Sequence, residues 1–565
     1  MSQTDLRQTP ADILILGNVT VLQLEGHLQK FYETIGLVCQ VETAEFNTIV
    51  ARVQAPIEAR IVFIFWEITN IFEHSWFKIQ GLESDAFDAL VEQLKAEIEM
   101  VFVSLSNVPL VFFNAFSAIK FASSMCDNRR LEVLCGRLNR HIEGLVKPNF
   151  RILNIDKIVA SMGFDAAFND RLFYAVSAPY SDRFFKHYVE VVCPTILALN
   201  GQIKKVLVLD CDNTLYGGVV GEDGIEGIHL SSQTFPGIVF QEVHSLLIEL
   251  YNRGVILCLS TKNDLSQIVD VFERHPDSLL KLEHFQVIKA NWDPKSDNIM
   301  QIADELNVGI DSLVFIDDSD FETDLAKSQL PGLDVYQVPK ELAYFPNMMR
   351  QISEKFVVST LTSEDIDRQS YYVNDTKRNE SKKSFKDFDE YLMSLGLEIK
   401  ISKNNQEHAT RLSQLALKTN QFNLTTLRYT ESEMTALLKD ANTDVFSCAV
   451  SDKFGSSGIT GLVVVTYTDD VAHIDTFLMS CRILGKKIEH ALISSVLSLI
   501  HNKRGISLVT ASYKATEKNA QVEKFYEECN FELLEDRVDQ KKYGFKITST
   551  YKQLSNHIEV LILAP

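Results

Sequence analysis

The chain lacks several features that would assign it to a specialised class of protein. Its nine cysteines include no Cys-x-x-Cys pair, which argues against a zinc site and a disulfide framework. No apolar run is long enough to span a bilayer. The residues after Met1 show no basic stretch followed by an apolar core, so we expect no signal peptide. Together these absences predict a protein of the reducing cytoplasm with no membrane partner.

Positive charge is also scarce. There are 55 lysines and arginines against 76 aspartates and glutamates, giving a formal net charge of -21. Nucleic-acid binding needs a basic surface, so we expect no nucleic-acid partner. The apolar content of 46% is that of an ordinary globular protein. A chain of 565 residues is too long for one core, and about three domains are expected.

The first 200 residues alternate strand-like and helix-like segments. Apolar segments at 13–16, 61–65 and 110–113 have the length of buried strands. Residues 85–102 predict a helix with Ser84 as its N-cap, and residues 165–174 predict a helix or turn. The alternation favours an α/β layer architecture.

The middle of the chain repeats this rhythm more cleanly. Strands are expected at 206–209, 255–259, 285–288 and 313–316, with helices at 239–251 and 295–306. Gly254 suits the end of the first helix. The pattern predicts a parallel sheet. Beyond residue 397, strands at 461–467 and 472–477 mix with helices.

Two aspartates follow the strand expected at 206–209. Asp210 and Asp212 are two positions apart, so an extended chain points both to the same side. Like charges this close repel each other unless a cation holds them. Such a pair at the carboxyl end of a parallel strand is typical of a site for Mg²⁺ and a phosphate.

Three further strands end in residues of complementary chemistry. Ser260 and Thr261 end the second strand, Lys295 follows the third, and Asp317 with Asp318 ends the fourth. In a parallel sheet these ends meet in one crevice. A nucleophilic carboxylate, a hydroxyl, a cation and metal-binding carboxylates are what phosphoryl transfer through an aspartyl-phosphate requires.

Two alternatives stay open for these motifs. Lys289 competes with Lys295, although its position in a strand-like run makes it the weaker candidate. Residues 317–320 also suit the start of a helix, where negative charge is favoured. A helix cap and a metal site do not exclude each other.

The order of the four motifs over about 110 residues resembles the haloacid dehalogenase (HAD) superfamily, and residues 210–224 are similar to its subfamily IIIC, the FkbH-like proteins. The resemblance implies that Asp210 is the nucleophile and Asp212 the general acid/base, whose main-chain carbonyl also helps to bind Mg²⁺. Thr261 or Ser260 would bind the phosphoryl group, with Thr261 preferred because Lys262 and Asn263 follow it as in the FkbH-like pattern.

The same resemblance assigns the remaining site residues. Lys295 would screen the charge between Asp210 and phosphate, and Asn213 would also contact phosphate. The metal ligands would be Asp210, Asp212, Asp317 and Asp318. Thr214 would support the loop.

Four glycines lie next to this site, at Gly217, Gly218, Gly221 and Gly224. They predict a small hairpin, which would act as a flap that excludes water. A Gly-rich phosphate cradle is the weaker interpretation, because the Lys-Ser/Thr of the Walker motif is absent. No large cap insertion separates the first two motifs, which suits a bulky or protein-borne substrate.

The C-terminal region resembles GNAT-type acyltransferases in two segments. Residues 519–531 are similar to a late helix and turn, with Asn530 where glycine is usual. Residues 482–487 are similar to the pyrophosphate-binding loop, although Lys487 replaces a small residue. The resemblance implies that Arg482, Gly485 and Lys487 bind a phosphopantetheine arm at a helix start; lysines on a helix surface are the alternative.

Two cysteines are candidates for a covalent role. Residues 418–426 and 479–485 resemble FkbH-like C-terminal segments, and Cys481 lies in the second beside Arg482. A neighbouring cation favours the thiolate, so Cys481 is a candidate carrier of an acyl thioester, with plain packing as the alternative. Cys211 lies between two aspartates and should point away from them into the sheet, which disfavours it as a nucleophile.

The first 200 residues resemble the degenerate SGNH-hydrolase-like domain of longer FkbH-like proteins. The hydrolase pattern has Gly-Asp-Ser after the first strand, whereas this chain has Gly17, Asn18 and Val19. No nucleophilic serine stands there, so a docking or structural domain is expected. Residues 169–171 and 180–181 are candidates for contact with the next domain.

These resemblances imply three domains and an activity. The domains are SGNH-like at 1–200, HAD-like with a minimal cap at 201–362, and GNAT-like at 397–565, with a charged helical linker at 363–396. The implied activity is Mg²⁺-dependent transfer of a glyceryl unit from 1,3-bisphosphoglycerate to the thiol of an acyl carrier protein, in polyketide or related biosynthesis. A phosphatase for another small or carrier-bound phosphate, or a carrier-protein-binding module, is the alternative.

Overall fold

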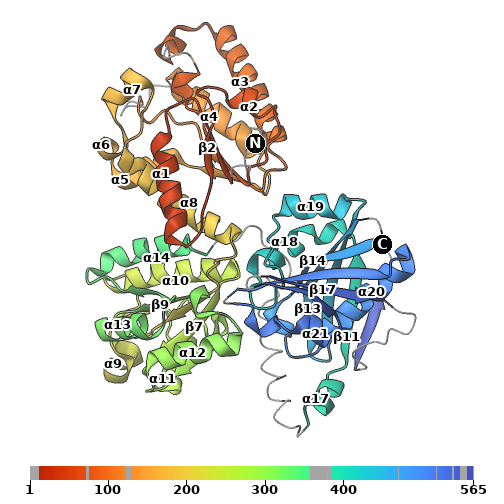
Figure 1. Cartoon of the computed structure of the whole chain (residues 1–565). Helices are drawn as coiled ribbons and strands as arrows, with labels where there is room; N and C mark the ends of the chain where they lie inside the picture. Colours follow the sequence, from red (N-terminus) through yellow and green to blue (C-terminus); the bar gives the residue numbers. More distant parts are fainter. Residues whose placement is uncertain are drawn as a thin grey trace. The chain divides into compact units, whose positions relative to one another are not determined.

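The protein is α/β, and the residues that the structure describes form three sheets (Figure 1). The computed structural model describes residues 12–71, 76–121, 129–356, 378, 381, 385, 387–468, 470–516, 518–537, 540–547 and 557–563. The chain forms two compact units, one of Met1–Cys193 with Tyr429–Glu433, the other of Pro194–Arg428 with Met434–Pro565. The predicted fold class, a multi-domain α/β protein with a parallel sheet in its middle region, is confirmed. Most of the predicted charged linker at 363–396 lies outside the described residues.

The first unit holds a five-stranded parallel sheet of order β2-β1-β3-β4-β5. Its strands are β1 (Ile13–Gly17), β2 (Val41–Thr43), β3 (Ile61–Phe65), β4 (Leu110–Asn114) and β5 (Phe150–Leu153). Its helices are α1 (Leu22–Thr34), α2 (Ile49–Arg52), α3 (Ser84–Ser104), α4 (Arg130–Glu143), α5 (Ile155–Met162), α6 (Phe164–Ala167), α7 (Asp170–Val176) and α8 (Asp182–Leu199), the last of which continues into the second unit. The three strands predicted here are confirmed.

One helix start in this unit differs from the prediction. Ser84 is the first residue of α3, and Glu83, in extended conformation, is the N-cap without a side-chain cap hydrogen bond. The difference is one residue, which is within the ordinary variation of a helix end. The helix buries Phe87, Val91 and Leu94 in the core, as an amphipathic helix does.

The second sheet is also parallel, of order β10-β9-β6-β7-β8. Its strands are β6 (Val206–Leu209), β7 (Ile256–Thr261), β8 (Phe285–Ala290), β9 (Leu313–Asp317) and β10 (Asp334–Gln337). Helices α10 (Gly237–Asn252), α11 (Leu265–Arg274) and α14 (Phe345–Ser353) pack on one face, and α12 (Lys295–Leu306) and α13 (Asp320–Gln329) on the other (Figure 1). Because β6 is flanked by connections on opposite faces, a crevice opens at its carboxyl end.

The segment with four glycines departs from the predicted hairpin. Gly217 and His229 exchange both backbone hydrogen bonds, at 3.0 and 2.8 Å, but the chain between them forms helix α9 (Val220–Gly227), kinked at Gly224. The Asp223 carboxylate accepts a hydrogen bond from the Val219 N–H at 2.9 Å. This local bond satisfies a free N–H at the helix start and outweighs the low helix propensity of glycine.

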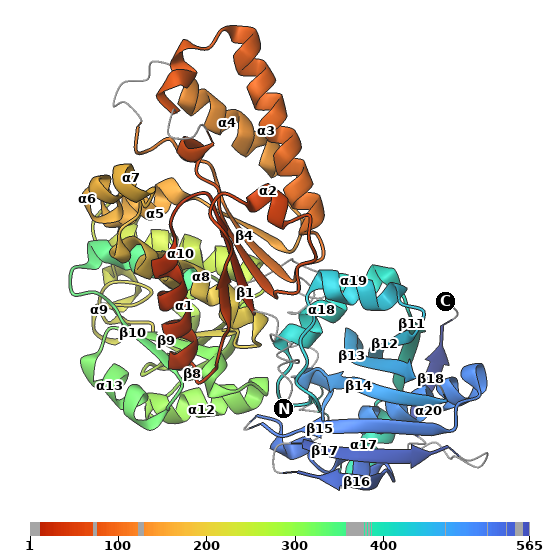
Figure 2. The ribbon, with the colours of Figure 1, turned by 45° about the horizontal axis from the view of Figure 1, so that its top comes forward.

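The third sheet is mixed and has eight strands, in the order β16-β17-β15-β14-β13-β12-β11-β18 (Figure 2). These are β11 (Leu397–Lys403), β12 (Thr443–Asp452), β13 (Gly455–Thr468), β14 (Val471–Met479), β15 (Leu508–Lys514), β16 (Glu532–Asp536), β17 (Gln540–Lys546) and β18 (Ile558–Ile562). Its helices are α17 (Phe388–Ser394), α18 (Ala409–Lys418), α19 (Glu431–Lys439), α20 (Ile488–Arg504) and α21 (Phe525–Glu528). Helix α20 packs into the core of this sheet.

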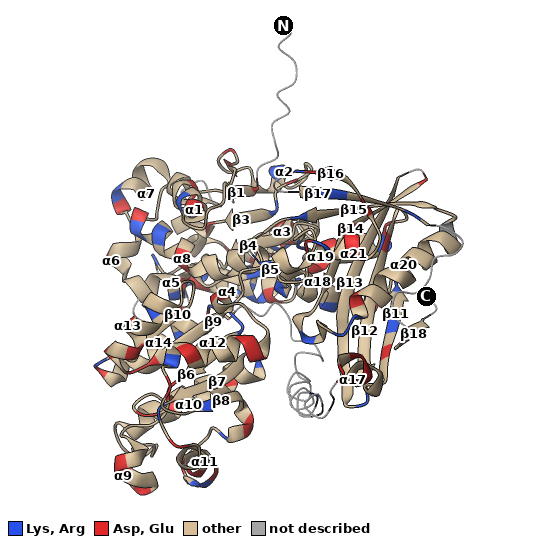
Figure 3. Cartoon of the chain, turned by 60° about the horizontal axis from the view of Figure 1, so that its bottom comes forward, with Lys and Arg blue, Asp and Glu red and all other residues tan. Residues whose placement is uncertain are grey.

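Acidic and basic residues are interspersed along the elements of both units (Figure 3). Asn530 adopts the left-handed conformation expected of it, with φ of 65°. Among the described helices, none combines the length and apolar character required to cross a bilayer.

Candidate active site

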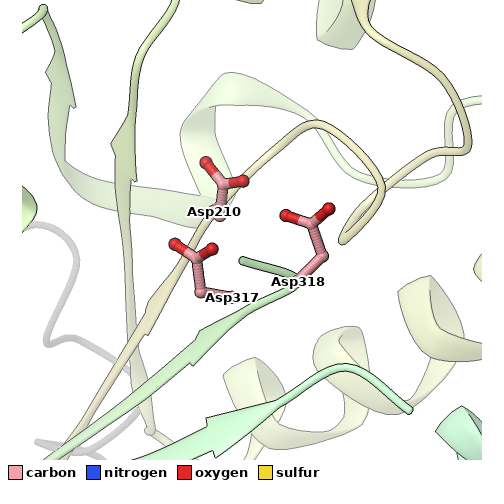
Figure 4. A group of neighbouring side chains, drawn as sticks. All are labelled: Asp210, Asp317 and Asp318. Carbon is pink, nitrogen blue, oxygen red and sulfur yellow. The ribbon is translucent and has the colours of Figure 1, made fainter. Parts of the chain in front are cut away.

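Three carboxylates converge at the carboxyl ends of β6 and β9 (Figure 4). Asp210 follows β6, Asp317 is the last residue of β9, and Asp318 comes next. One oxygen from each lies within 4.8 Å of one from each of the others. The two strands pair in parallel, and the Asp210 N–H donates to the Ile316 carbonyl at 3.0 Å. The sheet therefore brings together residues more than a hundred positions apart.

Lys295 lies between two of these carboxylates. Its ammonium group is 2.8 Å from Asp210 Oδ1 and 2.6 Å from Asp317 Oδ2. Its position as the first residue of α12 aims it into the crevice. The rival Lys289 instead pairs with Glu305 at 2.6 Å and donates to Gln301. The geometry thus favours Lys295, as the sequence did.

Three charged side chains of the site are nearly closed to solvent, and Asp318 is partly exposed. Burial changes the pKa values of the carboxylates. Asp210 is 5% exposed, Asp317 0% and Lys295 4%. Burial, with the charge of Asp317, raises the pKa of Asp210 to about 7, although Lys295 opposes part of the rise. Burial and Asp317 also raise the pKa of Asp318. A divalent cation would favour the ionised form of each carboxylate, so the donor set fits Mg²⁺.

Asp212 is placed apart from this cluster by two hydrogen bonds. Its Oδ1 accepts from the Val220 N–H at 3.1 Å, and its Oδ2 accepts from Asn263 Nδ2 at 3.0 Å. The Asp212 carboxylate is not among the three clustered carboxylates. The Asp212 side chain is thus held by the start of α9 and by Asn263, an arrangement that suits the predicted acid/base role. The metal contact predicted for Asp212 is through its main-chain carbonyl, and it stays a prediction.

Asn263 was not given a role by the sequence. Its Nδ2 also donates to Thr261 Oγ1 at 3.0 Å, and the residue is 4% exposed. One amide group therefore fixes both Asp212 and the threonine expected to bind phosphate. The sequence signal was weak: Asn263 lies two residues beyond the strand end, where side-chain direction depends on the loop.

The other expected phosphate contacts differ in their surroundings. The Ser260 hydroxyl is buried and has no hydrogen-bond partner among the residues that the structure describes, so β7 carries one unbonded hydroxyl beside the bonded Thr261. Asn213 adopts a φ of 51°, and its Oδ1 accepts from the Gly218 N–H at 2.9 Å. That bond shapes the loop. A side chain at Gly218 (φ 98°) would meet Asp223 Oδ2 at 2.7 Å, which explains the glycine.

Cys211 lies in the hydrophobic core and interacts with Thr261 through its thiol. It is 0% exposed and packs with Leu209 and Leu215 in the core. Burial and the neighbouring Asp210 charge raise its pKa well above the ordinary value. The thiol is therefore neutral and a poor nucleophile in this structure.

The residues expected to hold a pantetheine arm are only partly brought together. Cys481 and Arg482 lie in a short 3₁₀ turn after β14 and line one cavity. Lys487 caps α20 in the left-handed region and its Nζ contacts Asp389 at 3.0 Å. Gly485 has a φ of 76° and, like Lys487, is not among the residues that line the cavity.

Cys481 is also remote from the carboxylate cluster. Asn307 ends α12, and its Nδ2 donates to the Cys481 carbonyl at 3.0 Å. Lys295 begins the same helix, which has 12 residues and is about 18 Å long at about 1.5 Å per residue. The two predicted catalytic groups therefore occupy opposite edges of the β6–β10 sheet.

The gap between β14 and β15 is filled by the chain itself. The two strands pair at Val471–Ile474, and beyond that point residues 422–424 lie between them. Leu424 donates to the Phe477 carbonyl at 3.1 Å and accepts from the Lys514 N–H at 2.8 Å. Strand edges that would otherwise bind an extended ligand are thus already paired.

No family model and no curated protein sequence matches this chain. Among solved structures, it is similar to the N-terminal part of the protein BF1531 from Bacteroides fragilis, which contains a phosphatase domain complexed with Mg. That match has a TM-score of 0.55 and 24% identity over 64% of this chain and 97% of that one. The likeness is one of fold.

Other solved structures, one of them an acetyltransferase, match a smaller part of the chain. The spermidine/spermine N-acetyltransferase SpeG from Vibrio cholerae matches with a TM-score of 0.22 and 16% identity, over 26% of this chain and 93% of that one. A domain from Methanocaldococcus jannaschii matches with a TM-score of 0.23 and 16% identity, over 27% and 99% of the two chains.

Proposed function

We propose that the chain is a Mg²⁺-dependent phosphoryl-transfer enzyme of the HAD type that works through an aspartyl-phosphate on Asp210. The observation that carries this proposal is the convergence of Asp210, Asp317 and Asp318 around one point, with Lys295 bridging two of them. The Mg named with the Bacteroides fragilis structure gives further support. When bound, Mg²⁺ would neutralise the charge of the transferring phosphoryl group.

The side chains then take distinct roles. A carboxylate oxygen of Asp210 attacks phosphorus, and the bond from phosphorus to the leaving oxygen breaks. Asp212 donates a proton to that oxygen and later takes one from the water that hydrolyses the aspartyl-phosphate, so phosphate is released and Asp210 is restored. Lys295 stabilises the negative charge, and the Thr261 or Ser260 hydroxyl, with Asn213, orients the phosphoryl oxygens.

The finer proposal is that the substrate resembles 1,3-bisphosphoglycerate and that the glyceryl unit reaches a carrier-protein thiol. Two different bonds must break in that case. The HAD-like site would cleave phosphorus from oxygen at the phosphate ester. A thiolate would attack the carbonyl of the acyl phosphate, forming a thioester and releasing phosphate. Cys481 is the candidate intermediate thiol on this chain, with Arg482, Gly485 and Lys487 contacting the pantetheine arm.

Exposed aromatic side chains near the crevice favour a protein-borne substrate over a small free one. Trp292, in the loop that precedes Lys295, is 72% exposed, and Phe321, one residue into α13, is 68% exposed. Trp292 lies in the loop after β8, and Phe321 lies in the first turn of the helix that follows β9, a strand of the same sheet. Exposed aromatics of this kind mark interaction surfaces. A phosphatase for another carrier-bound phosphate uses the same surface and is the second candidate.

The phosphoryl-transfer proposal is tested by comparing two lysines. Purified protein is assayed for phosphate release from phosphate esters with Mg²⁺. Lys295→Ala should abolish most activity, whereas Lys289→Ala, which removes a lysine of the neighbouring strand, should leave it unchanged. No release by the natural protein, or equal activity of both variants, would contradict the proposal and favour a carrier-binding module.

The glyceryl proposal is tested by intact-protein mass spectrometry with 1,3-bisphosphoglycerate, with and without an acyl carrier protein. A glyceryl adduct on the chain that is lost in Cys481→Ala and kept in Cys211→Ala supports the relay. An adduct on the carrier alone supports direct loading. If neither protein gains the adduct while phosphate is released, the enzyme is a phosphatase of another substrate.

A further inference from the structure

A cavity of about 340 Å³ lies at the amino edge of the β6–β10 sheet. Lys205 and Ser312 precede β6 and β9, and Ile256 begins β7, so the cavity lies at the edge where these strands start. The carboxylate cluster follows the ends of β6 and β9. Ser312, which lines the cavity, and Asp317, which belongs to the cluster, are five positions apart along β9, about 16 Å at about 3.3 Å per residue. The cavity is therefore a second site.

The cavity is strongly basic in a strongly acidic protein. Lysines and arginines in its lining outnumber acidic residues by five to one, whereas the whole chain has a net charge of -21. The basic residues are Lys205, Arg411, Lys418, Arg482 and Lys518, and the acidic one is Asp311. Cations gathered around one cavity repel each other, and a bound anion relieves that repulsion.

Three of the five basic side chains, those of Lys205, Arg411 and Lys518, are held in place by contacts with the protein. Arg411 is 5% exposed, and its Nε donates to the Ile459 carbonyl at 3.1 Å. Lys205 donates to the Lys418 carbonyl at 2.7 Å, and Lys518 pairs with Asp311. Anchored cations lose less conformational entropy on binding than free surface lysines do.

The other residues that line the cavity indicate which class of ligand it suits. Asn307, Asn420, Gln421 and Ser480 add amide and hydroxyl groups that suit the several acceptor oxygens of a phosphate group. Apolar side chains of Ile256, Val308, Leu415 and Phe422 offer contacts for a short carbon skeleton. The volume is that of a small-molecule pocket and too small for a polymer.

We propose that this cavity binds a phosphate-bearing small anion at a site separate from the carboxylate cluster. The phosphate group would contact Arg482 and Lys418, with the thiol of Cys481 beside it. The phosphate can belong to a free metabolite or to the end of a phosphopantetheine arm. Binding of phosphate here does not depend on the activity proposed for Asp210.

The test is calorimetric titration of the full chain in buffer with a metal chelator. Without a divalent cation the three clustered carboxylates repel phosphate, so binding reports on the basic cavity. The probes are inorganic phosphate, 3-phosphoglycerate and 4′-phosphopantetheine. We expect saturable binding of at least one probe, weakened about tenfold by Arg482→Gln or Lys418→Gln. Lys400→Gln, an exposed lysine outside the cavity, should bind like the natural protein.

A second measurement does not depend on how the variants fold. Cys481 lines the cavity, so a bound probe should slow its alkylation by iodoacetamide in the natural protein, as followed by peptide mass spectrometry. Protection by 3-phosphoglycerate identifies a free metabolite as the ligand, and protection by 4′-phosphopantetheine alone identifies the arm. Absence of saturable binding, or affinity and protection unchanged in both cavity variants, would overturn the proposal.

Discussion

The two parallel sheets of this protein carry residues of different chemistry at the equivalent position, directly after the first strand of each sheet. Each has five strands, and in each the first strand along the chain is followed directly by a polar residue, Asn18 after β1 and Asp210 after β6. Both polar groups of the Asn18 side chain are used in structural hydrogen bonds. Its Nδ2 donates to the Glu67 carbonyl at 2.8 Å, and its Oδ1 accepts from the Glu67 N–H at 2.6 Å. Asp210 instead faces two other carboxylates.

The first crevice, at the ends of β1 and β3, also contains a carboxyl group, that of Glu67. Glu67 follows β3, is partly buried, and accepts a hydrogen bond from the Tyr180 hydroxyl. Burial raises its pKa to about 7. In the second crevice, at the ends of β6 and β9, the charged side chains of Lys295, Asp317 and Asp318 lie close together. The comparison teaches that a shared architecture provides the crevice, and that the residues just beyond the strand ends decide its chemistry.

The largest effect on the catalytic rate is expected to distinguish the two equivalent positions, Asp210 and Asn18. Asp210→Asn should lower phosphate release by about 10⁴-fold or more, because it removes the nucleophile. Asn18→Ala should leave the rate unchanged but destabilise the first unit by about 1 to 3 kcal/mol, because it leaves the buried Glu67 backbone groups unpaired. Rates are measured with saturating substrate, and stability by thermal unfolding. A large loss of activity in Asn18→Ala would contradict the claim that Asn18 serves structure while Asp210 serves catalysis.

A smaller effect is expected from Asn263→Ala. Loss of its bonds to Asp212 and Thr261 should reduce turnover of an alkyl phosphate about 10²-fold, since protonation of a poor leaving group depends on a positioned acid. An aryl phosphate such as 4-nitrophenyl phosphate needs little protonation and should be affected less. Equal losses for both substrates would show that Asn263 serves packing alone.

Metal binding should distinguish the two units by their stability. Mg²⁺ at about a hundred times its dissociation constant should stabilise the second unit by about 2.7 kcal/mol. Hydrogen exchange of peptides from β6 and β9 should slow, while peptides from β1 and β3 should not change. Asp318→Asn should reduce the effect. Protection of β1 and β3 equal to that of β6 and β9 would contradict the assignment of the metal site.

Glu67 should make the stability of the first unit depend on pH. Its folded pKa lies above its unfolded value, so the folded state holds a proton that the unfolded chain releases. That stabilisation is complete below the unfolded pKa and is lost as the pH rises to about 7. Between about pH 5 and about pH 8, the natural protein should lose about 3 kcal/mol relative to Glu67→Gln.

Hydrogen exchange of β3 and β4 peptides measures this loss, and Glu33→Gln, at an exposed position, is the control. An unchanged difference between Glu67→Gln and the natural protein across this range would show that Glu67 is ionised in the folded state.

Much of the carboxylate site at the ends of β6 and β9 was predictable because it depends on patterns within short stretches of sequence. The apolar runs before Asp210 and Asp317 predict buried strands, and the parallel arrangement then predicts that their ends meet. Lys295 was favoured over Lys289 for the same reason, since it follows a strand and begins a helix. These predictions needed only the side-chain alternation of strands and the order of elements.

Other features were not predictable because they depend on contacts between distant segments. The spacing of the glycines predicted a hairpin. The chain forms α9 instead, and Asp212 and Asp223 stabilise it by accepting hydrogen bonds from backbone N–H groups. The position of Cys481 is set by the contact with Asn307, 174 residues earlier. The basic cavity joins residues from two sheets, so no local pattern of charge reveals it.

The central claim is that Asp210 receives a phosphoryl group in a Mg²⁺-dependent reaction, and peptide mass spectrometry tests it most directly. The enzyme is mixed with a phosphate ester, quenched in acid during turnover, and digested at low pH to preserve acyl phosphates. The account predicts phosphate on the peptide that contains Asp210, lost when Mg²⁺ is chelated and absent from Asp210→Asn. Turnover with no phosphate on that peptide, or phosphate retained in Asp210→Asn, would contradict it.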